Sequence, residues 1–198
     1  MGLATFKGGI HPYEGKELSM SKPVSVLQPK GEMVFPLSQH IGAPAKPLVA
    51  KGDHVLVGQK IGEPGGFISA CIISSVSGTV KSLEPRMVAN GAMVPSIIVE
   101  NDGMYETVEG FGEDRDPKTL SKEEIRNIVK EAGIVGLGGA GFPTHVKLTP
   151  KDESAIDTII VNGAECEPYL TSDYRMMLEE PLSIIKGLNV ILQLFDNA

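Results

Sequence analysis

The chain has 198 residues, a length that allows one or two domains. Hydrophobic residues make up 41% of it, but aromatic residues only 5%, so aliphatic side chains must fill the core. A net charge of −7 without clustered Lys and Arg excludes a nucleic-acid-binding surface, and no run of 18 apolar residues encodes a transmembrane helix. The two cysteines are far apart and the four histidines lack ligand spacing. The sequence therefore predicts no disulfide framework, no metal site and, by default, a reducing compartment.

The first part of the chain, up to about Gly112, is predicted to be all-β. Short runs of aliphatic residues alternate with Gly, Pro and Asn-Gly turn signals, including Asn90-Gly91. Strands are expected in four of these runs: 24–27, 55–57, 72–73 and 97–99. Such a density of short strands indicates a small sandwich or barrel.

Within this part, the pattern from Lys51 to Val94 resembles the barrel-sandwich hybrid of biotinyl and lipoyl carrier domains. A carrier domain presents a modified lysine on the hairpin between its two halves. Here that hairpin lies near Glu63 to Ala70, and it contains no lysine. Because no amine is present to be acylated, a structural module for docking or interdomain packing is favoured over a swinging arm.

A charged linker from about 102 to 117 follows, and then the character of the sequence changes. Ser121 and Glu124 have the spacing of a capping box, and Ile125 begins an apolar face at helical spacing. Gly133 is a suitable stop signal. These features predict a helix from Lys122 to Ala132.

The segment from Gly136 to Thr144 holds four glycines in its first six residues. Backbone without Cβ atoms can approach a ligand closely, and successive N–H groups can form an anion-binding concavity. Pro143 could start a short helix, and Lys147 could neutralise a phosphate. The segment has the GxGxxG form, but a helix precedes it, which excludes a Rossmann fingerprint. It is not a Walker A loop either, so phosphate binding and a plain structural turn remain equally supported by composition.

A second candidate segment follows a predicted strand from Thr158 to Val161. Asn162 could pair with the edge of a heterocycle, because its amide both donates and accepts. Glu165 and Glu167 could accept hydrogen bonds from ribose hydroxyls or a carboxamide. The alternative is a solvated acidic turn.

Two helices are predicted at the end of the chain. A short one covers Ser172 to Leu178, and a longer one runs from Pro181 to about Phe195. Apolar residues nearly surround the longer helix, so we expect it to be buried on most sides. Because the chain stops at Ala198, we expect a fragment, or a partner surface that supplies the cover.

These segments resemble two known protein families. Gly138 to Thr144 with Lys147, followed by Asn162, Glu165 and Glu167, resembles the flavin- and NADH-binding segment of the 51-kDa-type subunit of respiratory complex I. The segments 6–12 and 36–44 resemble the RnfC subunit of the Rnf electron-transport complexes. Departures from the complex I pattern fall at three positions, where arginine, an acidic residue and glycine are replaced by Leu137, Ala164 and Tyr169.

The resemblance implies a two-domain α+β fold: a β-rich barrel-sandwich hybrid over residues 1–112, then the start of an α/β FMN/NADH-binding domain over residues 113–198. It implies a peripheral subunit on the cytoplasmic face of the membrane, in a complex that couples electron transfer between ferredoxin and NAD to movement of Na⁺ or H⁺. The implied partners are other subunits, NAD(H) and ferredoxin. The 4Fe-4S clusters of the family would lie beyond Ala198, so we expect this chain alone to be inactive.

The resemblance also implies roles for individual residues. The loop glycines and Lys147 would hold the flavin phosphate and approach the dinucleotide, and Phe142 would stack on NADH. Asn162 and Glu165 would contact the flavin ring, and Glu167 the nicotinamide side. The full set of expected cofactor-binding residues is Gly136, Gly138, Gly139, Ala140, Gly141, Phe142, Thr144, Lys147, Asn162, Glu165 and Glu167. The alternative function is a non-catalytic docking module of a membrane complex.

Overall fold

The computed structural model describes residues 8–10 and 12–198, and its contacts divide the chain into two compact units. Unit 1 contains the described residues of Met1–Val26 together with Ile160–Asn189. Unit 2 contains Leu27–Ile159 and Val190–Ala198. Phe6, Lys7 and His11, from the first of the two segments that resemble RnfC, lie outside the described residues. The domain boundary between residues 112 and 113 stays a prediction.

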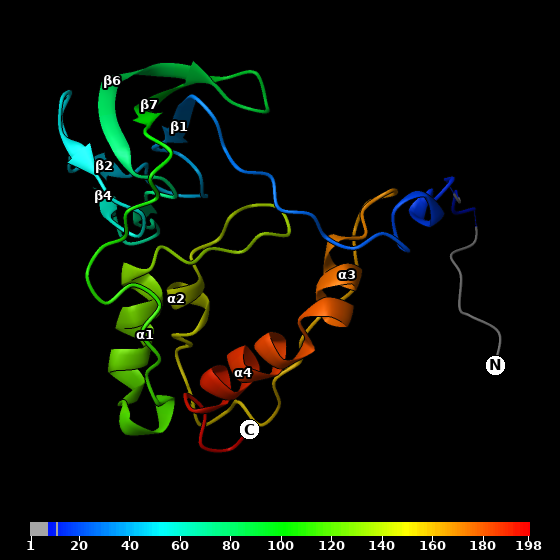
Figure 1. The fold of residues 1–198 in the computed structure, drawn as a ribbon. Coiled ribbons are helices and arrows are strands. Elements are labelled where there is room, and N and C mark those ends of the chain that lie inside the picture. Colours follow the sequence, from blue (N-terminus) through cyan, green and yellow to red (C-terminus); the bar gives the residue numbers. More distant parts are fainter. Residues whose placement is uncertain (1–7, 11) are drawn as a thin grey trace. The chain divides into compact units, whose positions relative to one another are not determined.

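The larger sheet of unit 2 has four antiparallel strands in the order β1-β7-β6-β3. The longest pair, β6 and β7, forms a curved hairpin that is visible in Figure 1. Its turn contains the predicted Asn90-Gly91 pair, and the Val88 N–H closes it by donating to the Ala92 carbonyl at 2.9 Å. The strands of this sheet are β1 (Glu32–Pro36), β3 (His54–Val55), β6 (Gly78–Met87) and β7 (Met93–Asn101).

A smaller antiparallel sheet, in the order β2-β4-β5, completes the β-rich part. Its strands are β2 (Lys46–Pro47), β4 (Lys60–Glu63) and β5 (Ile72–Ile73). The core of the β-rich part, here called the barrel cluster, contains one aromatic residue and is otherwise aliphatic, as the composition predicts. Its buried members are Phe35, Leu37, Ala45, Val55, Ile61, Ile72, Val76, Val80, Ile97 and Val99.

Three of the four strand predictions in this part are confirmed, although β3 covers only the first residue of the run 55–57. The prediction at residues 24–27 is wrong: no strand of the described residues pairs with this run, and Val26 and Leu27 are exposed. A strand needs a neighbour for its backbone groups and an apolar face to bury, and this run has neither.

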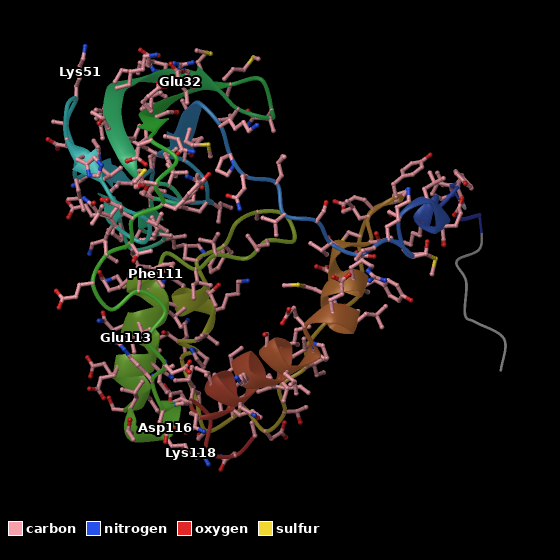
Figure 2. The ribbon with its side chains drawn as sticks, in the orientation of Figure 1. Glu32, Lys51, Phe111, Glu113, Asp116 and Lys118 are labelled. Carbon is pink, nitrogen blue, oxygen red and sulfur yellow. The ribbon has the colours of Figure 1, made fainter. Side chains whose placement is uncertain are left out.

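The predicted helix after the linker is confirmed as α1 (Lys122–Glu131). Its capping box is complete, because the Glu124 N–H donates to Ser121 Oγ at 3.2 Å and the Ser121 N–H donates to the Glu124 carboxylate at 2.8 Å. The helix ends in a Schellman arrangement around Gly133, whose φ of 65° lies in the left-handed region. The short 3-10 helix η2 (Pro117–Thr119) precedes it, and Figure 2 labels charged residues of this linker, among them Asp116, whose side chain accepts the Lys118 N–H.

Helix α1 packs on the end of the chain in a second, smaller apolar cluster, here called the helical cluster. Its buried members are Ile125, Leu194 and Phe195. Arg126 ties α1 to the segment after α2 (Thr144–Lys147): its Nε donates to the Leu148 carbonyl at 2.8 Å, and its Nη2 to Glu153 at 2.6 Å. The partly buried members of the cluster are Leu120, Leu148, Ile156, Ile159, Val190 and Ile191.

The predicted strand from Thr158 to Val161 is wrong. These residues belong to no strand, and the side chain of Ile160 is 85% exposed. An aliphatic run forms a strand only where another strand accepts and donates its backbone hydrogen bonds, and none of the described residues does so here. The two-part α+β architecture is nevertheless confirmed, because a curled β-module is followed by a mainly helical segment.

Unit 1 contains the short 3-10 helix η1 (Lys16–Leu18) and α3 (Ser172–Glu179), which confirms the predicted short helix with one extra residue. Helix α4 (Pro181–Leu192) ends three residues before the predicted limit. The described residues do not supply the cover that its apolar faces lead us to expect, because Leu182 is 70% and Ile185 52% exposed in its first turns. None of the helices in the described part of the chain is long and apolar enough to cross a membrane.

Candidate functional site

The Gly-rich segment of unit 2 forms a closed hairpin loop. The Gly136 N–H donates to the Phe142 carbonyl at 2.9 Å, and the Thr144 N–H donates to the Ile134 carbonyl at 3.0 Å. An antiparallel bridge between Val135 and Pro143 lies between these two bonds. The base of the loop is therefore fixed by its own backbone, while its tip is left to other partners.

The tip of this loop presents a run of backbone donors. Within the described residues, no backbone N–H from Leu137 to Phe142 donates to a protein acceptor. A Cβ atom built on Gly138 or Gly139 would meet nothing within 4 Å, so the space beside this backbone is open. Successive free N–H groups with open space in front of them are what an oxyanion of a phosphate needs.

Lys147 brings a positive charge to the same loop. A Cβ atom on Gly136 would lie 2.8 Å from Lys147 Nζ, which places the ammonium group beside the base of the loop. None of the ion pairs among residues 8–10 and 12–198 involves Lys147. The loop thus combines free N–H donors with a cation that is not neutralised by a described carboxylate.

The far side of the loop packs on the β-rich part of the same unit. The Ile41 N–H donates to the Ala140 carbonyl at 3.0 Å. A Cβ atom on Gly141 would lie 2.8 Å from the Gln39 carbonyl oxygen, which is closer than any real side chain allows. Glycine is therefore required at position 141 by the packing of the chain on itself, whatever else the loop binds.

The second candidate segment lies in unit 1, and Glu165 is its most constrained residue. Its carboxylate pairs with Lys16 Nζ at 3.2 Å and accepts the Asp173 N–H at 2.9 Å, and its side chain is only 7% exposed. Burial alone would raise the pKa of Glu165, but the Lys16 ammonium and the Asp173 N–H outweigh it and lower this pKa below its ordinary value. Glu165 is held as a carboxylate by groups of this chain.

Lys16 organises the whole segment, although no sequence motif points to it. Besides Glu165, its ammonium donates to the Leu170 carbonyl at 2.7 Å and to the Glu167 carbonyl at 3.4 Å. Glu165 and Glu167 lie 149 and 151 residues from Lys16 in the sequence, so no local pattern could have revealed these contacts. The Asn162 side chain accepts the Ala164 N–H at 2.9 Å and so forms an Asx turn.

The Lys16 contacts leave a small cavity of about 180 Å³ in unit 1. The Glu167 side chain belongs to its wall and forms no hydrogen bond with a described residue. The cavity is lined by Pro12, Glu14, Lys16, Glu165, Cys166, Glu167 and Pro168.

Tyr169, at a position where the complex I pattern has glycine, has a φ of 66°. Its N–H donates to the Glu14 carbonyl at 2.6 Å, and its ring packs edge-on against Tyr13 at a centroid distance of 6.1 Å. The left-handed backbone that favours glycine is thus present, and contacts within unit 1 hold a tyrosine in it.

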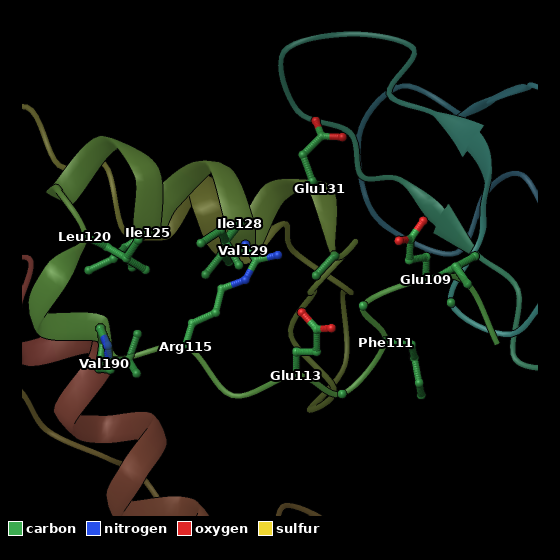
Figure 3. A pocket seen from close by; sticks show the side chains of 16 residues that line it. Glu109, Phe111, Glu113, Arg115, Leu120, Ile125, Ile128, Val129, Glu131 and Val190 are labelled. Atoms are coloured by element: carbon green, nitrogen blue, oxygen red, sulfur yellow. The ribbon is translucent and has the colours of Figure 1, made fainter.

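The predicted site residues fall into two groups. Gly136 to Lys147 lie in unit 2, whereas Asn162, Glu165 and Glu167 lie in unit 1, where the two carboxylates line one cavity. A further cavity of about 560 Å³ lies in unit 2 between α1 and the linker, lined by apolar side chains such as Ile128 and Val129 with Arg115 (Figure 3). No predicted cofactor-binding residue lines it.

The chain thus combines a curled antiparallel β-module with a mainly helical segment that carries a Gly-rich hairpin loop. Comparison with known families agrees with both parts. Residues 4–104 match the RnfC barrel sandwich hybrid domain, and residues 129–198 match the Nuo51 FMN-binding domain. The chain belongs to the RnfC family.

Curated relatives align with almost the whole chain. The C subunit of the proton-translocating ferredoxin:NAD(+) oxidoreductase complex of Clostridium ljungdahlii is 43% identical over 194 residues, which are 98% of this chain and 42% of the relative. The C subunit of the Na(+)-translocating complex of Acetobacterium woodii is 43% identical over 96% of this chain and 43% of its own length. The C subunit of the ion-translocating oxidoreductase complex of Pseudomonas aeruginosa is 38% identical over 97% of this chain and 25% of its own. The chain thus spans less than half the length of these relatives.

Proposed function

We propose that this chain supplies the phosphate-binding loop for FMN and NAD(H) in an RnfC-type subunit of an ion-translocating ferredoxin:NAD⁺ oxidoreductase complex. The observation that carries the proposal is the tip of the Gly-rich loop, where the N–H groups from Leu137 to Phe142 have no acceptor among the described residues. The names of the relatives and the match to an FMN-binding domain support the choice of ligand.

The residues present fit a phosphate. A phosphate monoester carries two negative charges and several acceptor oxygens, and it is bound in proteins by backbone N–H nests and by lysine. The loop offers both, with open space at Gly138 and Gly139 and the Lys147 ammonium beside Gly136. Ala140 and Phe142 would offer their backbone N–H groups to the phosphate, while Thr144 closes the base of the same hairpin. When bound, FMN would exchange a hydride with nicotinamide and pass single electrons onward.

The second segment is proposed as a hydrogen-bonding site of its own, argued from the contacts within unit 1. Glu165 is kept ionised by Lys16, so it would act as a hydrogen-bond acceptor, and the free carboxylate of Glu167 would do the same for a carboxamide. Asn162 would offer its amide nitrogen, because its oxygen is used in the turn with Ala164. These roles make the two side chains ligand-binding groups.

The names of the relatives, which are subunits of ion-translocating ferredoxin:NAD(+) oxidoreductase complexes, support a proposed setting for this loop. As an RnfC-type member of a membrane complex, the protein would sit at the cytoplasmic face, contact other subunits, bind NAD(H), and exchange electrons with ferredoxin through iron–sulfur clusters held elsewhere in the complex. Coupling to Na⁺ or H⁺ movement would be a property of the whole complex.

The test compares two variants of the full-length protein whose side chains at position 138 differ only in charge. Gly138→Glu places a carboxylate where the phosphate would lie, and Gly138→Gln places a side chain of the same size without the charge. Because a Cβ atom at Gly138 meets nothing within 4 Å, both variants should fold. FMN content and NADH dissociation constants are measured by flavin fluorescence and titration. We expect Gly138→Glu to bind FMN much more weakly than Gly138→Gln.

A second pair of variants tests the cation. Lys147→Gln should weaken FMN binding by about tenfold, the effect of one charge-assisted hydrogen bond. Lys151→Gln removes an exposed lysine four positions further on and should leave binding unchanged. If Gly138→Glu and Lys147→Gln both bind FMN and NADH as the unmodified protein does, the loop is a structural turn and the docking-module alternative is favoured.

A further inference from the structure

The Gly-rich loop is attached to the β-rich part of unit 2 at both of its ends. Before the loop, a Cβ atom on Gly133 would lie 2.5 Å from the Cys71 carbonyl oxygen. After it, the corresponding atom on Gly141 would lie 2.8 Å from the Gln39 carbonyl oxygen and 3.0 Å from His40 Cα. In both places two stretches of backbone are packed against each other with no room for a side chain, and in both places φ is positive, at 65° and 62°.

The contact surface on the β-rich part is made of two adjacent segments, Gln39–Ile41 and Ala70–Cys71, here called the platform. The Ile41 N–H donates to the Ala140 carbonyl at 3.0 Å, the one backbone hydrogen bond between platform and loop tip in the described residues. A cavity of about 270 Å³, with His40, Cys71, Gly133 and Val135 in its wall, lies between the platform and the residues just before the loop. The contacts between loop and platform are thus the Ile41–Ala140 hydrogen bond and the close backbone approaches at Gly133 and Gly141.

His40 holds the two halves of the platform together. The residue is buried, with only 7% of its surface exposed. Nε2 accepts the Ala70 N–H at 3.1 Å, and Nδ1 lies 3.2 Å from the Ile41 carbonyl oxygen. An acceptor at Nε2 requires the tautomer with its proton on Nδ1, which donates to Ile41. The imidazole thus links the segment that touches Ala140 to the segment that touches Gly133.

The hairpin of residues 63–70, where a carrier domain would present its lysine, is hydrogen-bonded to the chain next to the platform. The Ala43 N–H donates to the Ile68 carbonyl at 2.9 Å, and Ser69 Oγ donates to the Ala43 carbonyl at 2.8 Å. The Gly65 N–H donates in turn to Ser69 Oγ at 3.0 Å. The hairpin is therefore folded down onto the chain beside His40 and is not free to carry a group to another site.

We propose that the β-rich module is the positioning device of the Gly-rich loop, and that His40 is its positioning residue. The proposal rests on the proposed function, since it assigns a purpose to the platform only if the loop binds nucleotide phosphate. His40 touches no ligand in this scheme. It fixes Ile41 and Ala70, and through them the direction in which the N–H groups of the loop tip point.

The test is made on the full-length protein with three histidine variants. His40→Leu removes both ring hydrogen bonds, while His40→Gln keeps an acceptor near the position of Nε2. His54→Leu is the matched control, because His54 lies in the same module but pairs with Asp102, away from the platform. Hydrogen exchange at the Ile41 amide, the FMN dissociation constant, and KM and kcat for NADH are measured for each at a temperature where thermal melting shows it folded.

His40→Leu is expected to speed exchange at Ile41, and to raise the FMN dissociation constant and the KM for NADH by about tenfold, the effect of one buried hydrogen bond. The kcat at saturating NADH should change much less, His40→Gln should restore most of the loss, and His54→Leu should bind normally. A variant with faster Ile41 exchange and unchanged binding would overturn the proposal, because the loop would then not depend on the platform.

Gly141→Ala keeps the proposal testable if His40→Leu does not fold. It forces the loop away from Gln39 without touching the imidazole, and it should weaken FMN binding in the same way; unchanged binding would overturn the proposal. The charge variants at Gly138 separate the two levels of inference. If Gly138→Glu loses FMN and His40→Leu does not, only the positioning role fails. If Gly138→Glu binds normally, the nucleotide function itself fails.

Discussion

The barrel cluster and the helical cluster are built from similar aliphatic side chains but reach different degrees of burial. The barrel cluster has ten buried members, and the helical cluster has three buried members with six partly buried ones around them. Two antiparallel sheets close over the first, so every strand has a neighbour. The second is formed by the capped helix α1, the end of α4 and irregular segments around them.

The barrel cluster is therefore closed by its own strands, whereas the helical cluster depends on the ordering of the loops around it. A sheet that pairs all its strands satisfies its backbone and buries one face at the same time. The helical cluster must instead order long loops, such as residues 148–159, for a small apolar gain. We therefore expect the β-rich part to retain its structure under conditions in which the helical cluster opens.

The largest expected effect is a loss of stability when the barrel cluster is truncated. Ile97→Ala should lower the free energy of unfolding by about 2–5 kcal/mol, because its side chain is 0% exposed and truncation leaves a cavity. Ile191→Ala makes the same truncation on a partly buried member of the helical cluster, and it should cost well under half of that. Urea titration followed by circular dichroism measures both. Equal losses in the two variants would show that the regions do not differ in packing.

A smaller effect is expected to be confined to the helical cluster. Ser121→Ala removes the hydroxyl that caps α1 and should cost about 1 kcal/mol of helix stability. Because α1 carries Ile125 into the helical cluster, hydrogen exchange should quicken over residues 122–131 while β6 and β7 stay protected. Ser154→Ala, which alters a side-chain turn with Asp152, is the matched serine control. Faster exchange in β6 and β7 would mean that the two clusters open together.

The parts of the fold that were predictable from sequence are those set by local chemistry. The capping box at Ser121 and the stop at Gly133 defined α1, and the Asn90-Gly91 pair defined the turn of the long hairpin. The strand predicted at Thr158 to Val161 failed because strand formation depends on a partner that a linear pattern does not reveal. The sequence likewise showed that the helix with Leu182 and Ile185 needs cover but not what supplies it, since the cover of an apolar helix is a tertiary property.

In the candidate site, too, the features set by local chemistry were predictable and those set by distant contacts were not. The free N–H groups of the Gly-rich loop follow from glycine content and the closing hairpin, both local features. The roles of Lys16 and His40 could not be predicted, because each acts through contacts with residues distant in sequence, Glu165 and Ala70. Gly141 was expected to serve a ligand, and the structure shows that packing against Gln39 already requires a glycine there.

The smallest expected effect concerns the pH response of unit 1. Burial tends to raise the pKa of Glu165, and the Lys16 ammonium with the Asp173 N–H lowers it below the ordinary value of 4.5. A carboxyl group with a depressed pKa in the folded state contributes stability above its unfolded pKa, and that contribution is lost as the pH falls through the folded pKa. The Lys16 pairing should therefore weaken only in the acidic range below pH 4.5.

Lys16→Met removes the main opposing charge and leaves burial to act, so the pKa of Glu165 should rise. Lys22→Met, at an exposed lysine of the same unit, should leave it unchanged. Carboxyl-carbon NMR titration of Glu165 in the three proteins measures the shift. An unshifted Glu165 in Lys16→Met would mean that the Asp173 N–H alone holds the carboxylate. In that case the ionised state of Glu165, on which its proposed role as a hydrogen-bond acceptor depends, would be a local property of the α3 N-terminus and not a consequence of the Lys16 contact.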